Sequence, residues 1–112
     1  MASAPRPEDG PVLVTIEYRI DPHHAGDFAA AIRDLGVVRR RDGAMYWELF
    51  RDGADPRRYM EIFLTESWAE HLRQHTRVVI ADRVLEQHVR SFHVGDGPVV
   101  VSHFISAYAT EV

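Results

Sequence analysis

The chain of 112 residues contains no cysteine, no lysine and no asparagine. Without cysteine it has no disulfide, no thiolate nucleophile and no cysteine-ligated zinc or iron–sulfur site. Without lysine it cannot form a Schiff base with a carbonyl substrate or with pyridoxal phosphate. Acid–base chemistry is therefore left to the carboxylates, the hydroxyls and the seven histidines, whose charge changes near neutral pH.

Long apolar runs and an excess of positive charge are also missing. No apolar stretch approaches the roughly 20 residues that a membrane span needs, and the opening MASAPRPEDGP lacks the apolar core of a signal peptide. The net charge of −4 gives nucleic acid no general attraction. We therefore predict a cytoplasmic and self-contained protein with no membrane helix before the domain, and no membrane or nucleic-acid partner.

The order of predicted elements indicates a ferredoxin-like α+β fold. β-Branched and aromatic residues predict strands, here over residues 11–20, 44–52, 58–65 and 99–107. Capping and apolar spacing predict helices, here from Pro22 to Gly36, from Ser67 to about His75, and from Val78 to Phe92. The βαββαβ order predicts an antiparallel sheet with helices on one face. This single domain spans residues 12–108, between a flexible lead-in (1–11) and a tail (109–112).

The two central strands carry two alternating sets of side chains. The more apolar set is expected against the helices: Met45, Trp47, Leu49, Met60, Ile62 and Leu64. The other set holds too many large rings to face water alone: Tyr46, Glu48, Phe50, Tyr59, Glu61 and Phe63. We therefore predict that a second copy covers this face, which gives a homodimer packed through the sheets. The charges at Glu17, Glu48 and Glu61 are expected to pair within a network that includes Arg19 and His103.

The segment SWAEHLRQH places Trp68, His71, Leu72 and His75 on one stripe of a helix. Two interpretations remain open: a packing face whose histidines bond to carbonyl groups, or the wall of a pocket that contains a general base. The His71–His75 spacing also allows both imidazoles to reach one metal ion, but no third ligand is fixed by spacing. We therefore expect no native metal.

Three segments carry a family resemblance: VTIEYRIDP, DGAMYWELFRD and ESWAEHLRQHTRV. Over residues 12 to 105 the chain resembles the dimeric α+β barrel superfamily, within it the antibiotic biosynthesis monooxygenase type. The match is closer still to the C-terminal soluble region of some major-facilitator drug exporters. The resemblance implies a dimer with a pocket between helices and sheet in each subunit. Trp68 and His75 match the tryptophan and histidine of the family.

Family members include cofactor-free monooxygenases that act on polycyclic phenols, haem-degrading enzymes, isomerases and proteins without known activity. Two features depart from the family pattern. HTRV stands where a serine or proline usually follows the helical histidine, and the chain lacks the asparagine of some haem-degrading and quinone-forming relatives. The second departure argues against haem oxygenation of the known type.

The resemblance implies a cofactor-independent oxidation of an aromatic or polyketide-like molecule in secondary metabolism. His75 or His71 would be the general base, and the substrate-binding residues would be Trp68, Trp47, Tyr18 and Leu72. The same residues fit an isomerase or a cyclase that works through an enolate. A non-catalytic binding module, related to the exporter appendage, is the alternative to an enzyme.

Overall fold

The computed structural model describes residues 4–76 and 79–108, and for His75 it describes the backbone alone. Four strands form one sheet in the order β2-β3-β1-β4, and each neighbouring pair is antiparallel. Their bounds are β1 Val12–Arg19, β2 Tyr46–Arg51, β3 Arg58–Thr65 and β4 Val100–Ile105. This topology confirms the predicted ferredoxin-like α+β fold.

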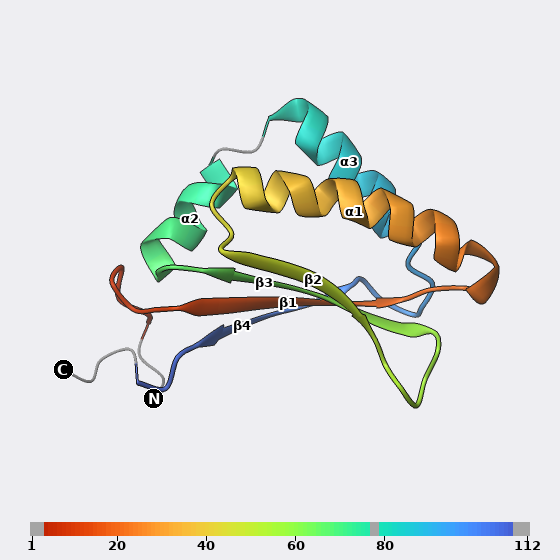
Figure 1. Ribbon diagram of the computed structural model, residues 1–112, viewed down its shortest axis with the longest axis horizontal. Helices are drawn as coiled ribbons and strands as arrows, with labels where there is room; N and C mark the ends of the chain where they lie inside the picture. The colour runs from red at the N-terminus through yellow and green to blue at the C-terminus, as the bar shows by residue number, and fades with distance from the viewer. Residues whose placement is uncertain (1–3, 77–78, 109–112) are drawn as a thin grey trace.

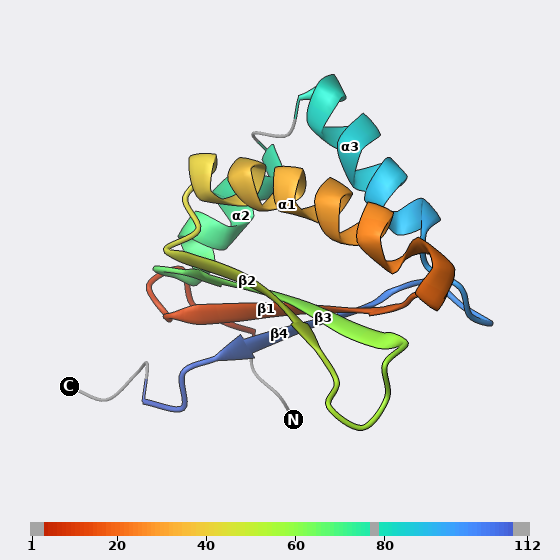
Figure 2. The same ribbon diagram turned by 45° about the vertical axis from the view of Figure 1, so that its right-hand side comes forward.

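All the helices of the described residues lie on one face of the sheet (Figure 1). They are η1 Pro22–His24, α1 Ala25–Arg41, α2 Trp68–Thr76 and α3 Ile80–Ser91. Figure 2 shows α1 and α3 crossing above the strands, with α2 beside the C-terminal end of α1 and the opposite face of the sheet uncovered. Within the described ranges, no helix has both the length and the apolar character needed to cross a membrane.

Helix α1 is longer than the sequence indicates. It continues through Arg41, beyond the end predicted at Gly36. Gly36 is buried inside the helix, and a Cβ added there would lie 2.6 Å from Cδ2 of Trp47. The glycine therefore allows the helix to touch the indole of β2 and does not end the helix. The chain turns instead at Gly43, which has a φ of 117°, a conformation that favours glycine.

The register of the sheet corrects the predicted faces of β3. Residues directly opposite each other on neighbouring strands point to the same face, and Phe63 is paired with both Val14 and Trp47. Val14 and Phe63 are buried under the helices, as is Glu61. Trp47 and Leu49 thus face the helices as predicted. The prediction for β3 was wrong, because Met60, Ile62 and Leu64 point to the open face.

The core fills the space between β1 and the helices. Phe28 of α1 is fully buried at its centre, and its ring contacts Tyr18, Tyr59 and Phe92 at centroid distances of 5.2, 5.4 and 6.0 Å. The same core also contains the buried hydrophobic residues Val12, Ile16, Ile20, Ile32, Leu35 and Val89. The helix face of the sheet is therefore well packed near Phe28.

Candidate functional site

A cavity of about 400 Å³ lies between the helices and the sheet. Its apolar wall is formed by Val14, Ile16, Leu35, Val38, Phe63 and Val101, and its polar wall includes His71, His103, Gln74, Arg39, Arg83 and Arg90. The volume lies in the range of roughly 300–1,000 Å³ that small-molecule sites occupy. A cavity lined by helix and sheet residues is what the resemblance implies.

Two histidines meet on the wall of this cavity. His71 comes from α2 and His103 from β4, and their ring centroids lie 4.7 Å apart. Trp68 contacts both rings, at 5.2 Å from His71 and 5.8 Å from His103. His71 is 4% exposed. The stripe predicted on α2 thus presents a buried imidazole to the cavity, beside a second imidazole from a distant strand.

The remaining predicted residues of α2 are placed differently. Leu72 is 48% exposed and does not line the cavity. His75 belongs to α2, but its side chain lies outside the described part of the chain, so its role as a base stays a prediction. Across the part of the chain that the structure describes, no three side chains of histidine, aspartate or glutamate gather as metal ligands do.

The predicted pocket residues Trp47 and Tyr18 both bond to Glu61. Nε1 of Trp47 donates a hydrogen bond of 2.9 Å to Oε2 of this carboxylate, and the Tyr18 hydroxyl donates one of 3.1 Å to Oε1. Glu61 is completely buried. Burial, together with the charge of Glu61, raises the pKa of the Tyr18 hydroxyl well above its usual value. These two rings therefore contact the carboxylate and do not line the cavity.

Arg39 supplies the positive charge that Glu61 requires. Its Nε donates to Oε2 of Glu61 at 3.1 Å, and its guanidinium lies 4.7 Å from the centroid of the Phe63 ring. Burial lowers the pKa of Arg39, but the charge and hydrogen bond of Glu61, with a smaller effect from Glu86, hold it above its usual value. Arg39 is thus a fixed cation, and it also lines the cavity.

The charged residues of α3 also face the cavity. Arg83, Glu86 and Arg90 line it. Glu86 bonds to Arg90 at 3.1 Å and lies 3.7 Å from Nη1 of Arg39. Spacing within α3 alone could not assign this face, because it does not show that Glu86 lies across from Arg39 of α1.

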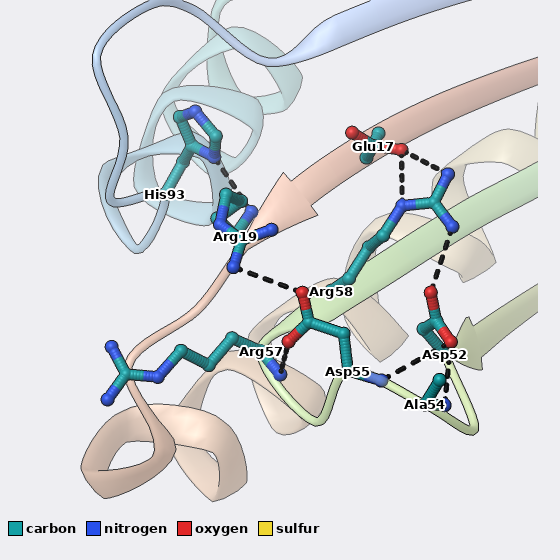
Figure 3. Close-up of polar contacts among 8 residues, drawn as sticks. All are labelled: Glu17, Arg19, Asp52, Ala54, Asp55, Arg57, Arg58 and His93. Atoms are coloured by element: carbon teal, nitrogen blue, oxygen red, sulfur yellow. Dashed lines mark hydrogen bonds and ion pairs between the residues drawn. The ribbon is translucent and has the colours of Figure 1, made fainter.

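Among the contacts that the structure describes, Glu17, Glu48 and Glu61 have partners other than the expected Arg19 and His103. Glu17 pairs with Arg58 at 2.6 Å, and Arg19 pairs with Asp55 at 3.1 Å (Figure 3). His93, whose Nδ1 accepts the backbone N–H of Arg19 at 2.9 Å, is the histidine of this region. Glu48 accepts from the backbone N–H of Leu49.

Sequence reasoning missed two cavity residues, His103 and Arg39. His103 shares strand parity with Val101 and Ile105, a signal that pointed to the helix face. Arg39 lies in the loop that the sequence predicts after Gly36. In the structure α1 continues through Arg41, so Arg39 stands on the helix and lines the cavity.

Comparison with known proteins identifies both a family and a shared fold. Residues 1–111 match the sequence profile of a family described as transmembrane secretion effector. No curated protein matches the chain.

Solved structures with the same fold include an antibiotic biosynthesis monooxygenase-like protein of Caulobacter crescentus. It is 15% identical, with a TM-score of 0.74 over 89% of this chain and 92% of that one. SnoaB of Streptomyces nogalater, a cofactor-independent oxygenase, is 11% identical, with a TM-score of 0.72 over 90% and 97% of the two chains. Rv0793 of Mycobacterium tuberculosis is 14% identical, with a TM-score of 0.66 over 85% and 93%. The predicted resemblance to the antibiotic biosynthesis monooxygenase type is thus confirmed for the fold.

Proposed function

Because the chain belongs to the transmembrane secretion effector family and shares the fold of antibiotic biosynthesis monooxygenase-like proteins, we propose that it oxidises a small molecule without a cofactor. The substrate is an aromatic or polyketide-like compound bound in the cavity, and His71 is the general base. The observation that carries the proposal is the pair of imidazoles on the cavity wall, with His71 buried and its ring 4.7 Å from that of His103.

The residues of the cavity fit the needs of such a reaction. A neutral imidazole removes a proton from the phenol, and the phenolate gives one electron to O₂. The phenoxyl and superoxide radicals combine at a ring carbon, and loss of water from the hydroperoxide leaves a quinone carbonyl. One oxygen atom thus enters the product and the other leaves as water. The second imidazole, His103, stabilises the charged ring of His71 or passes on its proton, and the apolar wall excludes water.

Oxygen uptake with 1,8-dihydroxyanthrone tests this proposal. The wild type should consume O₂ faster than the buffer, and His71→Gln should reduce the enzymatic rate by about 100-fold, the usual contribution of a general base. His24→Gln is the matched control, because His24 is exposed at the end of η1 and makes no side-chain capping bond to α1. Equal rates in the His71 variant and the wild type would remove the base from the proposal.

The family match favours a second candidate function, a non-catalytic domain that holds a secreted compound, related to the soluble appendage of drug exporters. Such a domain binds the anthrone but leaves oxygen uptake at the level of buffer. A ligand present at 100 times its Kd stabilises the fold by about 2.7 kcal/mol, so thermal unfolding detects binding without turnover. The cytoplasmic location predicted from the sequence is part of both proposals.

We also propose that a second copy covers the open face of the sheet. That face presents large apolar side chains to solvent: Tyr46 (45% exposed), Phe50 (49%), Val100 (56%) and Phe104 (57%). Met60, Ile62 and Leu64 lie between them and are half-buried. Contiguous exposed apolar surface of this kind marks an interaction site. A homodimer through the sheets buries it, as the resemblance implies.

A further inference from the structure

We propose that Arg39 anchors a carboxylate of the ligand, so that the cavity selects aromatic acids over their neutral analogues. This inference rests on the proposed function, because it assumes that the cavity between helices and sheet is the ligand site. It adds the chemical class of the ligand and a specificity-determining residue.

The first observation is that the hydrogen-bonding capacity of Arg39 is mostly unused. Its side chain is 17% exposed, and Nε donates to Glu61. Among the residues that the structure describes, neither Nη1 nor Nη2 donates a hydrogen bond, since Oε2 of Glu86 lies 3.7 Å from Nη1. The four N–H groups on Nη1 and Nη2 thus have no acceptor at hydrogen-bond distance among the described residues, and Arg39 lines the cavity.

The second observation is that the guanidinium is held in one orientation. Glu61 fixes Nε and is itself fixed by Trp47 and Tyr18. The ring of Phe63 lies beneath the guanidinium. A planar guanidinium held in this way presents two parallel N–H groups, the geometry that binds both oxygens of a carboxylate. The predicted pocket residues Trp47 and Tyr18 therefore act at a distance, by positioning Glu61.

The third observation is that the carboxylates near the cavity already have arginine partners. Glu61 pairs with Arg39, Asp42 and Asp82 pair with Arg41, and Glu86 pairs with Arg90 and, at 3.7 Å, with Arg39. Within the described ranges Arg83 has no carboxylate at ion-pair distance, and it also lines the cavity. The donors that remain open thus favour a ligand oxygen that accepts hydrogen bonds, and a negative one most strongly.

The register of the sheet gives the size of the ligand. One row of partners crosses three strands, from Phe63 of β3 to Val14 of β1 and His103 of β4. Phe63 is the residue whose ring lies under Arg39. Neighbouring strands lie about 4.8 Å apart, so the anchor and the histidine pair are separated by roughly 10 Å along this row. Val14 supplies an apolar floor between them. The ligand is therefore a ring system with its acid group at one end and its reactive position toward His71 and His103.

Binding of 2-naphthoic acid and 2-naphthamide, measured by isothermal titration calorimetry, tests the inference. The two probes have the same rings and differ in the charge of one group. The wild type should bind the acid about tenfold more tightly than the amide, and Arg39→Gln should bring the two affinities together. Arg33→Gln is the matched control, because Arg33 is exposed on the same helix and does not line the cavity.

Arg39→Gln also removes the charged partner of Glu61, so a second variant is needed that keeps this charge. Arg39→Lys keeps a positive charge near Glu61 but loses the planar pair of donors, so it should weaken the acid at least threefold and leave the amide unchanged. Equal binding of both probes by the wild type would overturn the inference and leave the cavity in place. A preference for the acid that survives in Arg39→Gln and disappears in Arg83→Gln would identify Arg83 as the anchor and would also overturn the inference. If neither probe binds, the inference is overturned, and oxygen uptake and thermal unfolding with 1,8-dihydroxyanthrone decide the proposed function separately.

Discussion

Gly36→Ala perturbs the contact between α1 and β2 with a single methyl group. The added Cβ would lie 2.6 to 2.8 Å from three atoms of the Trp47 indole, so the ring or the helix must move. In a helix, alanine is favoured over glycine by about 1 kcal/mol. Overpacking costs about 1–3 kcal/mol. A displaced indole also loosens the hydrogen bond from Trp47 to Glu61, and a hydrogen bond to a charged group contributes about 1.5–3 kcal/mol.

The net effect predicted for Gly36→Ala is a loss of about 2 kcal/mol or more in the free energy of unfolding. For a domain of this size that lowers the melting temperature by roughly 8 °C. Gly26→Ala on the same helix is the control, because a Cβ there meets no atom within 4 Å and should be neutral or stabilising. Circular dichroism melts of the two variants decide. A Gly36→Ala protein as stable as Gly26→Ala would refute the close contact.

Three further predictions concern the buried carboxylate, the buried hydroxyl and the open sheet face. Glu61→Gln leaves Arg39 buried without its counter-charge and should lower the free energy of unfolding in urea by about 3–5 kcal/mol. Glu86→Gln changes a half-exposed partner 3.7 Å from Arg39 and should lower it by about 1 kcal/mol or less. Similar losses in both variants would contradict the assignment of Glu61 as the buried partner of Arg39. Because the pKa of Tyr18 is raised in the folded state, the unfolded chain loses this proton first, and stability should fall above about pH 10 by up to roughly 1.4 kcal/mol per pH unit. Tyr18→Phe should flatten this fall, and an unchanged slope would show that the hydroxyl ionises freely in the fold. Phe104→Asp on the open sheet face should convert a dimer to a monomer in analytical ultracentrifugation, whereas Val37→Asp on the exposed side of α1 should not; a monomeric wild type would remove the dimer.

Local patterns were sufficient for the elements of the fold. The first helical segment begins at Pro22 as predicted, and Asp21 caps it because its side chain accepts the N–H of His23. Ser67 caps α2 by accepting the N–H of Glu70 at 3.1 Å. Each signal depends on neighbours within three residues, which the sequence displays directly.

Features that depend on distant partners were misjudged. Gly36 resembles a helix end in the sequence, and only the position of Trp47 shows why a glycine stands there. Glu61 was assigned to the face expected to pack against a second copy, because the three donors that make its burial under the helices possible come from β1, α1 and β2. Apolar character alone therefore chose the wrong face of β3.

The same limit applies to the site. The stripe on α2 predicted that Trp68 and His71 share one face, and their rings lie 5.2 Å apart; the role of His71 as a base stays a prediction. Its partner His103 lies 32 positions further along the chain, and nothing in the local pattern of β4 specifies which helix it meets. The separation of His103 and Arg39 across the sheet follows from the strand order β2-β3-β1-β4, which must be known before a cavity can be described.

The most direct test of the small-molecule site is an NMR titration of the histidine side chains in ¹⁵N-labelled protein with 1,8-dihydroxyanthrone. The ring nitrogens of His71 and His103 should shift together and saturate at one ligand per chain, because both line the cavity. The exposed His23 and His24 serve as internal controls and should remain unchanged. Shifts confined to the exposed histidines, or no saturable shift at His71 and His103, would contradict a ligand site between the helices and the sheet.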